Sequence, residues 1–481
     1  MNKKYIIAAI AILIIICACA FALTNSSSNA STSIDANALE DRGNLVVDSE
    51  SLDESKGLYH TDSADVNTIL VKNGGVLKLA DSIINKTGDT ATSGDDADFY
   101  GVNSAILVNT NATLDISNVE INTDSKGSNG IFVTNAEAST SGSSGDVGQG
   151  AEGGQPPEAN GNGGQGGGEQ PGASTVEGNT QATIKNVKIT THSDKSRGLD
   201  ATYNGIINAE NVIINTDGQS CAALATDRGE GQVHVKNSQI NTGVSKDSGR
   251  GSPLIYSTGN ITAENTKGTA YVSQIACIEG KNSIELTDCD LTGYGGGNRQ
   301  DGDTYVDLGG IFIYQSMSGD ADVGTSTFTA KNSQLKIAED SPVYTTAPMF
   351  HITNTACVIN LENTECSFGS GTFLESSSQN QWGSEGSNGG VCELNTDNEN
   401  IGGNVIVDSI SSLTWNMKNT QFKGAVNSTG NATVNVGEGS TWTLSGDSSV
   451  SSLTVDGTIE YGEYSLTVNG QKYDSSNPYN G

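Results

Sequence analysis

Short runs of alternating apolar and polar residues recur along this chain, with polar residues between them. Ala112–Ile116 and Gln232–Val235 alternate with a period of two, while Ala105–Asn109 and Gly130–Thr134 are more continuously apolar. A period of two is typical of β-strands, and the repeats show no helical period of 3.6 residues. The pattern therefore predicts an all-β chain made of many short strands.

A four-residue motif repeats on the same spacing as these strands: Asn, a small or β-branched residue, a polar residue and an apolar one. The clearest intervals are 25 residues, from Asn186 to Asn211, and 26 residues, from Asn211 to Asn237. The motif begins at Asn118, Asn186, Asn211, Asn237, Asn332, Asn363 and Asn419, and at Asp81 and Asp288 with Asp in the lead position.

About three short strands in each repeat of about 25 residues predict a single-stranded right-handed parallel β-helix, a solenoid with a disordered Gly-rich insertion. Successive coils would stack about 4.8 Å apart. The lead asparagines would then form a ladder, each in the left-handed bend between two strands and bonded to the next. We assign this ladder a structural role.

The predicted organisation follows changes in composition. Residues 24–60 are rich in Ser, Asn and Asp and predict a flexible linker, and residues 136–180 are a Gly/Gln/Pro-rich, disordered insertion. The β-helix is expected over 61–135 and 181–470, and 471–481 form a tail. Six cysteines follow the leader and are expected to be buried apolar residues, although a pair such as Cys357 and Cys366 could close.

Residues 1–23 predict export. Lys3 and Lys4 precede the apolar run Tyr5–Ala18, and Ala20–Ala22 offers a cleavage site of small residues. Two alternatives remain open: the run is nearly long enough to span a bilayer uncleaved, and Ile16–Cys19 resembles a bacterial lipobox with Cys19 as the lipidated residue. The membrane would be contacted only through this segment.

Charge narrows the possible partners. Asp and Glu outnumber Lys and Arg by 56 to 24, which gives a formal net charge of −32. Such a chain repels nucleic acid and anionic lipid, so neither is expected to bind. Its oligomeric state does not follow from the sequence.

The C-terminal stretch Ser440–Leu444 contains Trp-x-Leu and is followed by the closely spaced strands Leu453–Val455 and Gly457–Ile459. These residues resemble the last coils of autotransporter passenger domains. More broadly, residues 61–470 resemble the adhesin-like β-helix surface proteins of anaerobic bacteria and methanogenic archaea. The resemblance implies a right-handed parallel β-helix and a cell-surface location.

Candidate chemistry is sparse. Some parallel β-helices are pectate lyases or polygalacturonases, but Asn215-Thr216-Asp217 recurs as Asn122-Thr123-Asp124 and is a turn rather than a glycosidase motif. A lyase would combine clustered carboxylates that hold Ca²⁺ with an Arg or Lys that abstracts a proton. The residues that best fit an anionic-ligand patch are Arg197, Asp200, Asp227, Arg228, Arg250 and Tyr256. The alternative is that the arginines simply neutralise nearby carboxylates.

No cofactor is expected apart from weakly bound Ca²⁺, for which Asp301, Asp303 and Asp307 are candidates. Three functions follow as hypotheses. The first is a cell-surface adhesin-like protein that binds a glycan or another extracellular ligand without catalysis. The second is a polysaccharide lyase that acts on acidic glycans, and the third is a structural spacer of the cell envelope.

Overall fold

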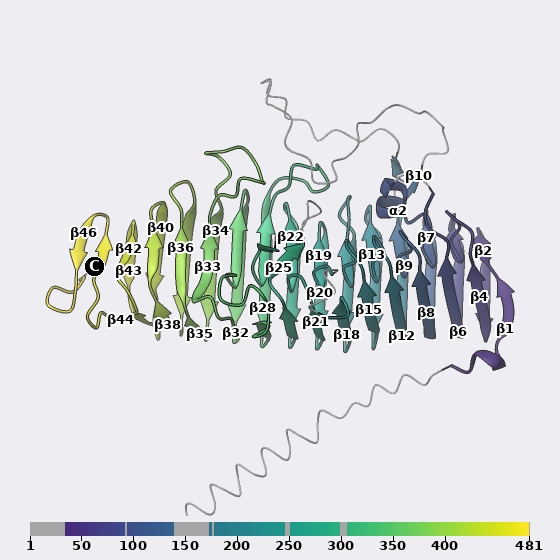
Figure 1. Cartoon of the computed structure of the whole chain (residues 1–481), viewed down its shortest axis with the longest axis horizontal. Helices are drawn as coiled ribbons and strands as arrows, with labels where there is room; N and C mark the ends of the chain where they lie inside the picture. The colour runs from purple at the N-terminus through teal and green to yellow at the C-terminus, as the bar shows by residue number, and fades with distance from the viewer. Residues whose placement is uncertain are drawn as a thin grey trace, which may run out of the picture. The chain divides into compact units, whose positions relative to one another are not determined.

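The computed structural model describes residues 34–91, 94–138, 173–175, 178–245, 251–298 and 305–480. Residues 34–481 form one compact unit in which strand follows strand in parallel coils, as Figure 1 shows. The predicted all-β parallel β-helix is confirmed. The predicted leader with Cys19, and most of the predicted insertion 136–180, lie outside the described residues.

Three parallel sheets make up the described coils. Sheet 1 contains β1 (Glu40–Gly43), β3 (Ser51–Ser55), β4 (Gly57–Thr61), β6 (Val76–Thr87), β8 (Thr113–Asp124), β12 (Gln181–His192), β14 (Ile206–Glu210), β15 (Ile213–Asp217), β17 (Gln232–Lys236), β18 (Gln239–Thr242), β20 (Asn260–Glu264), β21 (Lys267–Ala270), β23 (Ser283–Thr287), β24 (Asp290–Gly293), β28 (Thr325–Lys331), β29 (Gln334–Ile337), β31 (Ala356–Glu362), β32 (Glu365–Ser367), β34 (Val391–Asp397), β37 (Ser412–Lys418), β40 (Asn431–Val436) and β43 (Ser452–Val455).

Sheet 2 contains β2 (Leu45–Asp48), β5 (Ile69–Lys72), β7 (Ile106–Asn109), β9 (Ile131–Thr134), β13 (Leu199–Thr202), β16 (Leu224–Thr226), β19 (Ile255–Ser257), β22 (Ala276–Glu279), β27 (Ile311–Tyr314), β30 (Phe350–Thr353), β33 (Thr372–Ser376), β36 (Asn404–Val407), β39 (Val426–Ser428), β42 (Ser448–Val450), β45 (Leu466–Val468) and β46 (Gln471–Tyr473). Sheet 3 contains β35 (Asn400–Gly402), β38 (Gln421–Gly424), β41 (Thr441–Leu444) and β44 (Thr458–Glu460). The remaining described elements are the antiparallel pairs β10 (Ala136–Ala138) with β11 (Ala173–Thr175) and β25 (Gly296–Asn298) with β26 (Tyr305–Asp307), the 3₁₀ turn η1 (Ala36–Ala38) and the helix α2 (Gly94–Tyr100).

The core runs along the axis of the coils. In β8 every second side chain is buried, so that Leu114, Ile116 and Ile121 stack under their partners Ala182, Ile184 and Ile189 in β12. Each coil therefore buries a thin apolar strip against its neighbours. This arrangement explains how a chain with only 5% aromatic residues fills a long core.

Two predicted boundaries are wrong. The predicted linker 24–60 contains β1 to β4, and β1 already pairs with β4 while β2 pairs with β5. The predicted tail 471–481 contains β46, which pairs antiparallel with β45, and the Tyr479 hydroxyl donates to the carbonyl of Leu453 at 2.9 Å. Composition alone did not reveal these strands, because the outward side chains of the terminal coils are polar, as the side chains of a flexible linker would be.

The predicted left-handed bends are confirmed, but the ladder of side-chain bonds is interrupted: Asn237 Nδ2 donates to Glu210 Oε1 at 3.4 Å, and Asn419 Nδ2 donates to Asp397 Oδ1 at 3.1 Å. All seven predicted asparagines have φ between 48° and 55°, in the left-handed region. Asn186 Nδ2 donates to Asn118 Oδ1 at 3.2 Å, and Asn211 Nδ2 donates to Asn186 Oδ1 at 3.2 Å. Asn363 bonds Asn332 in the same way at 2.9 Å. The ladder also includes Asn265 and Asn398, which the motif missed because Gly268 is not apolar and Glu399 is neither small nor β-branched.

Substitutions at Asn211 separate two contributions of a ladder residue to stability: its left-handed backbone conformation and its side-chain hydrogen bond. Asn211→Ala should lower the free energy of unfolding by about 1–2 kcal/mol, because alanine is strained in the left-handed region and forms no ladder bond. Asn211→Gly also removes the ladder bond, but glycine adopts the left-handed conformation without strain. It should therefore lower the free energy of unfolding less than Asn211→Ala does. Urea denaturation of both variants measures the difference; a glycine variant as damaged as the alanine variant would contradict the backbone role.

Candidate functional site

The outer face of sheet 2 is covered where the predicted site residues lie. Side chains alternate across a strand, so Leu107, Phe132 and Asp200, which are neighbours in register, all point away from the core. All three are nevertheless buried. Figure 1 shows α2 beside β9, on this side of the coils.

Helix α2 is held against the sheet by polar contacts. The Thr202 hydroxyl donates to the carbonyl oxygen of Phe99 at 3.0 Å, and Asn129 Nδ2 donates to the carbonyl oxygen of Ala97 at 3.3 Å. Residues Gly94–Asp98 thus begin a helix that closes over β9 and β13.

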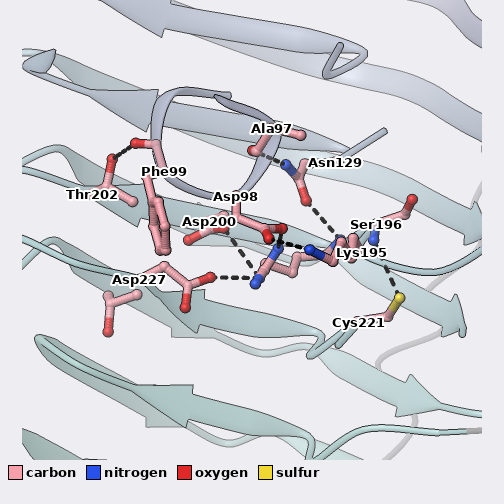
Figure 2. A network of polar contacts seen from close by, with 12 residues as sticks. Ala97, Asp98, Phe99, Asn129, Lys195, Ser196, Asp200, Thr202, Cys221 and Asp227 are labelled. Carbon is pink, nitrogen blue, oxygen red and sulfur yellow. Dashed lines mark hydrogen bonds and ion pairs between the residues drawn. The ribbon is translucent and has the colours of Figure 1, made fainter. Parts of the chain in front are cut away.

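Beneath α2 lies a cluster of buried charges, of which Figure 2 labels Asp98, Lys195, Asp200 and Asp227. Arg197 lies at its centre. Its Nη1 atom donates to Asp98 Oδ1 at 2.8 Å, and its Nε atom lies 2.6 Å from Asp227 Oδ2 and 3.4 Å from Asp200 Oδ2. Lys195 Nζ reaches the other oxygen of Asp98 at 2.9 Å. One guanidinium thus connects α2 to two successive coils, which carry Asp200 in β13 and Asp227 just after β16.

The cluster holds more carboxyl groups than nearby cations can balance. Burial, followed by the closeness of Asp227, raises the pKa of Asp200 well above its ordinary value, and burial raises the pKa of Asp227 to about 6 although Arg197 opposes this. Burial also disfavours ionised Asp98, but Arg197 and Lys195 outweigh it and lower the pKa of that carboxyl.

Within the described part of the chain, neither side-chain oxygen of Asp200 accepts a hydrogen bond, although Arg197 Nε lies 3.4 Å from one of them. Asp200 lies within hydrogen-bonding reach of Asp227. One proton shared by these two carboxyl groups would satisfy both.

The neighbouring candidates Arg228 and Tyr256 extend the cluster along the same face. The guanidinium carbon of Arg228 lies 3.7 Å from the centre of the Phe99 ring, and its Nε donates to Asp320 Oδ1 at 3.1 Å. The Tyr256 hydroxyl donates to Glu279 Oε2 at 2.7 Å, and Glu279 is itself buried. These side chains connect α2 to the loop that follows β27.

The structure therefore brings together Arg197, Asp200, Asp227, Arg228 and Tyr256, but as an internally paired network. The side chain of Arg197 is only 9% exposed and faces three carboxylates, so the simple alternative of charge neutralisation describes it best. Such an arginine is poorly placed to abstract a proton from a substrate.

The other predicted site residues cannot be placed in this network. Arg250, Asp301 and Asp303 lie outside the described residues, as does the side chain of Asp307. In the ranges that the structure describes, no group of three or more His, Cys, Asp or Glu side chains is arranged to hold a metal ion. Within the same ranges, no helix has both the length and the apolar character needed to cross a membrane.

No protein-family model matches the chain, and no curated protein matches it.

A second candidate site lies on the outer face of sheet 1, across β28, β31, β34 and β37. A groove of about 310 Å³ is formed there by residues of four successive coils. Its lining residues are Thr329, Lys331, Asn360, Leu361, Glu362, Asn395, Thr396, Asp397, Asn416 and Lys418.

A second asparagine ladder, which we call the face ladder, runs through the groove: Asn360, Asn395 and Asn416 line it, and Asn435 continues the ladder on β40. These residues are partners in register on successive strands. Asn395 Nδ2 donates to Asn360 Oδ1 at 3.0 Å, Asn416 Nδ2 to Asn395 Oδ1 at 2.8 Å, and Asn435 Nδ2 to Asn416 Oδ1 at 2.8 Å. Asn395 Nδ2 also donates to Glu393 Oε1 at 3.2 Å, and Asn360 Nδ2 donates to Thr329 Oγ1 at 3.3 Å. Each half-buried amide oxygen keeps a second lone pair that the ladder bonds do not use.

The charges that border the groove balance one another. Lys331 and Lys418 contribute two positive charges, and Glu362 and Asp397 contribute two negative ones. Lys418 Nζ pairs with Asp397 Oδ2 at 2.7 Å. The groove is thus formally neutral in a chain whose net charge is −32.

The sequence carries a signal for the face ladder that the repeat motif did not use. Asparagine stands three residues before a corner asparagine in three successive coils, as Asn360 before Asn363, Asn395 before Asn398, and Asn416 before Asn419. A residue three positions before the corner falls on the outward side of the preceding strand, so this recurrence predicts a stacked amide face.

Proposed function

We propose that this protein is an exported, surface-displayed β-helix that binds a neutral glycan in the groove over β28, β31, β34 and β37, without cleaving it. The face ladder carries the proposal, because it presents identical half-buried amides on successive coils, about 4.8 Å apart. An extended chain of sugar hydroxyls, which both donate and accept hydrogen bonds, complements such a repeat.

Charge favours a neutral ligand over an acidic one. The border of the groove is formally neutral, while the chain as a whole repels polyanions. We retain the adhesin-like role that the sequence resemblance implies, and we propose that residues 1–23 tether the protein to the membrane. The lyase alternative is less well supported, because its proposed base, Arg197, is buried among carboxylates.

The test is a glycan array probed with the full chain, followed by titration of each glycan that binds and by product analysis. Asn395→Ala should weaken binding about tenfold or more, because it removes the central amide of the groove. Asn241→Ala is the matched control: Asn241 also donates to a stacked asparagine, Asn215, at 3.0 Å, but lies outside the groove. The affinity of the Asn241→Ala variant for the glycan should be unchanged.

Each outcome decides between the hypotheses. Intact glycan recovered from a complex that Asn395→Ala weakens supports the proposal. Binding that Asn395→Ala leaves unchanged would place the ligand elsewhere, and shortened or unsaturated products would favour a lyase. The absence of binding to any glycan would favour a structural spacer.

A further inference from the structure

Two cysteines on the groove strands β31 and β34 are neighbours inside the coils. Cys357 in β31 and Cys392 in β34 are partners in register, and each is 2% exposed. Both side chains point into the core, where the column that they share continues to Ser326 on one side and Leu413 on the other.

The spacing of the two residues suits a disulfide. Neighbouring strands lie about 4.8 Å apart, and Cα atoms joined by a disulfide are about 4.4–6.8 Å apart. Their pairing in register makes the two thiols neighbours in the core. A hydrogen bond with Cys357, and then burial, raise the pKa of the Cys392 thiol well above its ordinary value. Both are free in this structure.

We propose that Cys357 and Cys392 form an intrachain disulfide between neighbouring coils when the protein meets a small-molecule disulfide. One cysteine thiolate attacks that disulfide and releases a small thiol, and the second cysteine then attacks the mixed disulfide and releases another. One S–S bond breaks and one forms. The protein loses two electrons, and the two thiol protons leave with the two small thiols.

This pairing replaces the one that the sequence suggested. Cys366 is the partner in register of Leu335 in β29, beyond the corner that ends β31, so it does not face Cys357. The proposed bond would join the strands that carry Asn360 and Asn395, but it does not depend on glycan binding.

The experiment uses the reduced full chain, held in a buffer of oxidised glutathione until its free-thiol count no longer changes. The remaining thiols are alkylated, and the chain is digested without reduction by a protease that cleaves after glutamate. Cuts at Glu339, Glu362, Glu365, Glu375, Glu385 and Glu393 place Cys357, Cys366 and Cys392 in three separate peptides.

The expected result is one linked pair of peptides, Cys357 with Cys392, lighter by two hydrogens than the sum of the free peptides, with Cys366 alkylated. Formation should accelerate as pH rises, because the thiolate is the reactive species and the pKa of Cys392 is raised. Cys366→Ser should leave the linked pair unchanged, whereas Cys357→Ser and Cys392→Ser should each abolish it. Full alkylation of Cys357 and Cys392, a lasting glutathione adduct, or a link from Cys357 to Cys366 would overturn the proposal.

Discussion

Replacing Arg197 by methionine should destabilise the protein by about 3–5 kcal/mol, because the change leaves Asp98, Asp200 and Asp227 buried with Lys195 as their remaining cation in the cluster. Methionine preserves much of the volume, so the loss reports charge rather than packing. The loss should be smaller near pH 5 than near pH 8, since protonation relieves the uncompensated carboxylates. The free energy of unfolding in urea at the two pH values measures both effects.

Arg42→Met is the matched control for this change. Arg42 also pairs with carboxylates, Glu40 and Glu54, but its side chain is 29% exposed. Pairs open to solvent contribute about 1 kcal/mol or less. A loss in Arg197→Met no larger than in Arg42→Met would show that α2 is held to sheet 2 by other contacts. Asp227→Asn in the Arg197→Met background should restore part of the loss.

Glu399→Gln should stabilise the protein at pH 8 by about 2–3 kcal/mol and have little effect at pH 4. Glu399 follows the corner residue Asn398 and is buried at a position that Ser238 and Ser333 occupy in other coils. Its Oε1 accepts a hydrogen bond from the backbone N–H of Thr364 at 2.8 Å. Glutamine keeps an oxygen acceptor and removes the charge.

The sign of the pH dependence follows from the raised pKa. Burial raises the pKa of Glu399 from 4.5 to about 7, so the folded state binds the proton more tightly than the unfolded state does. This contribution to stability is complete below about pH 4.5 and is lost as the pH rises through 7. Unfolding free energies of the wild type and Glu399→Gln should therefore diverge from pH 5 to pH 8. Parallel curves would contradict the assignment.

The fold followed from the sequence because its signals are local and repeated. Asn186, Asn211 and Asn237 mark successive corners at nearly constant spacing, and asparagine tolerates the left-handed bend that each corner needs. The order of 40–60 was missed, since strands such as Ser51–Ser55 present mostly polar side chains to solvent and resemble a linker in composition.

The burial and internal pairing of the candidate site residues could not be predicted in the same way. The grouping of Arg197, Asp200 and Asp227 follows from the repeat, but their burial depends on helix α2, whose Asp98 lies about 100 residues before Arg197 in the chain. No periodic pattern signals that contact. The face ladder, in contrast, has a regular spacing from the corner asparagines in the sequence. This spacing predicts a stacked amide face only once the corner positions have been identified.

The most direct test of glycan binding is a crystal structure of the full chain with an oligosaccharide selected on the array. Our account predicts intact sugar rings along the groove, hydrogen-bonded to the side-chain amides of Asn395 and Asn416, with Arg197 still paired beneath α2. Sugar bound over Asp200 and Asp227 with α2 displaced, or a cleaved product in either place, would contradict it.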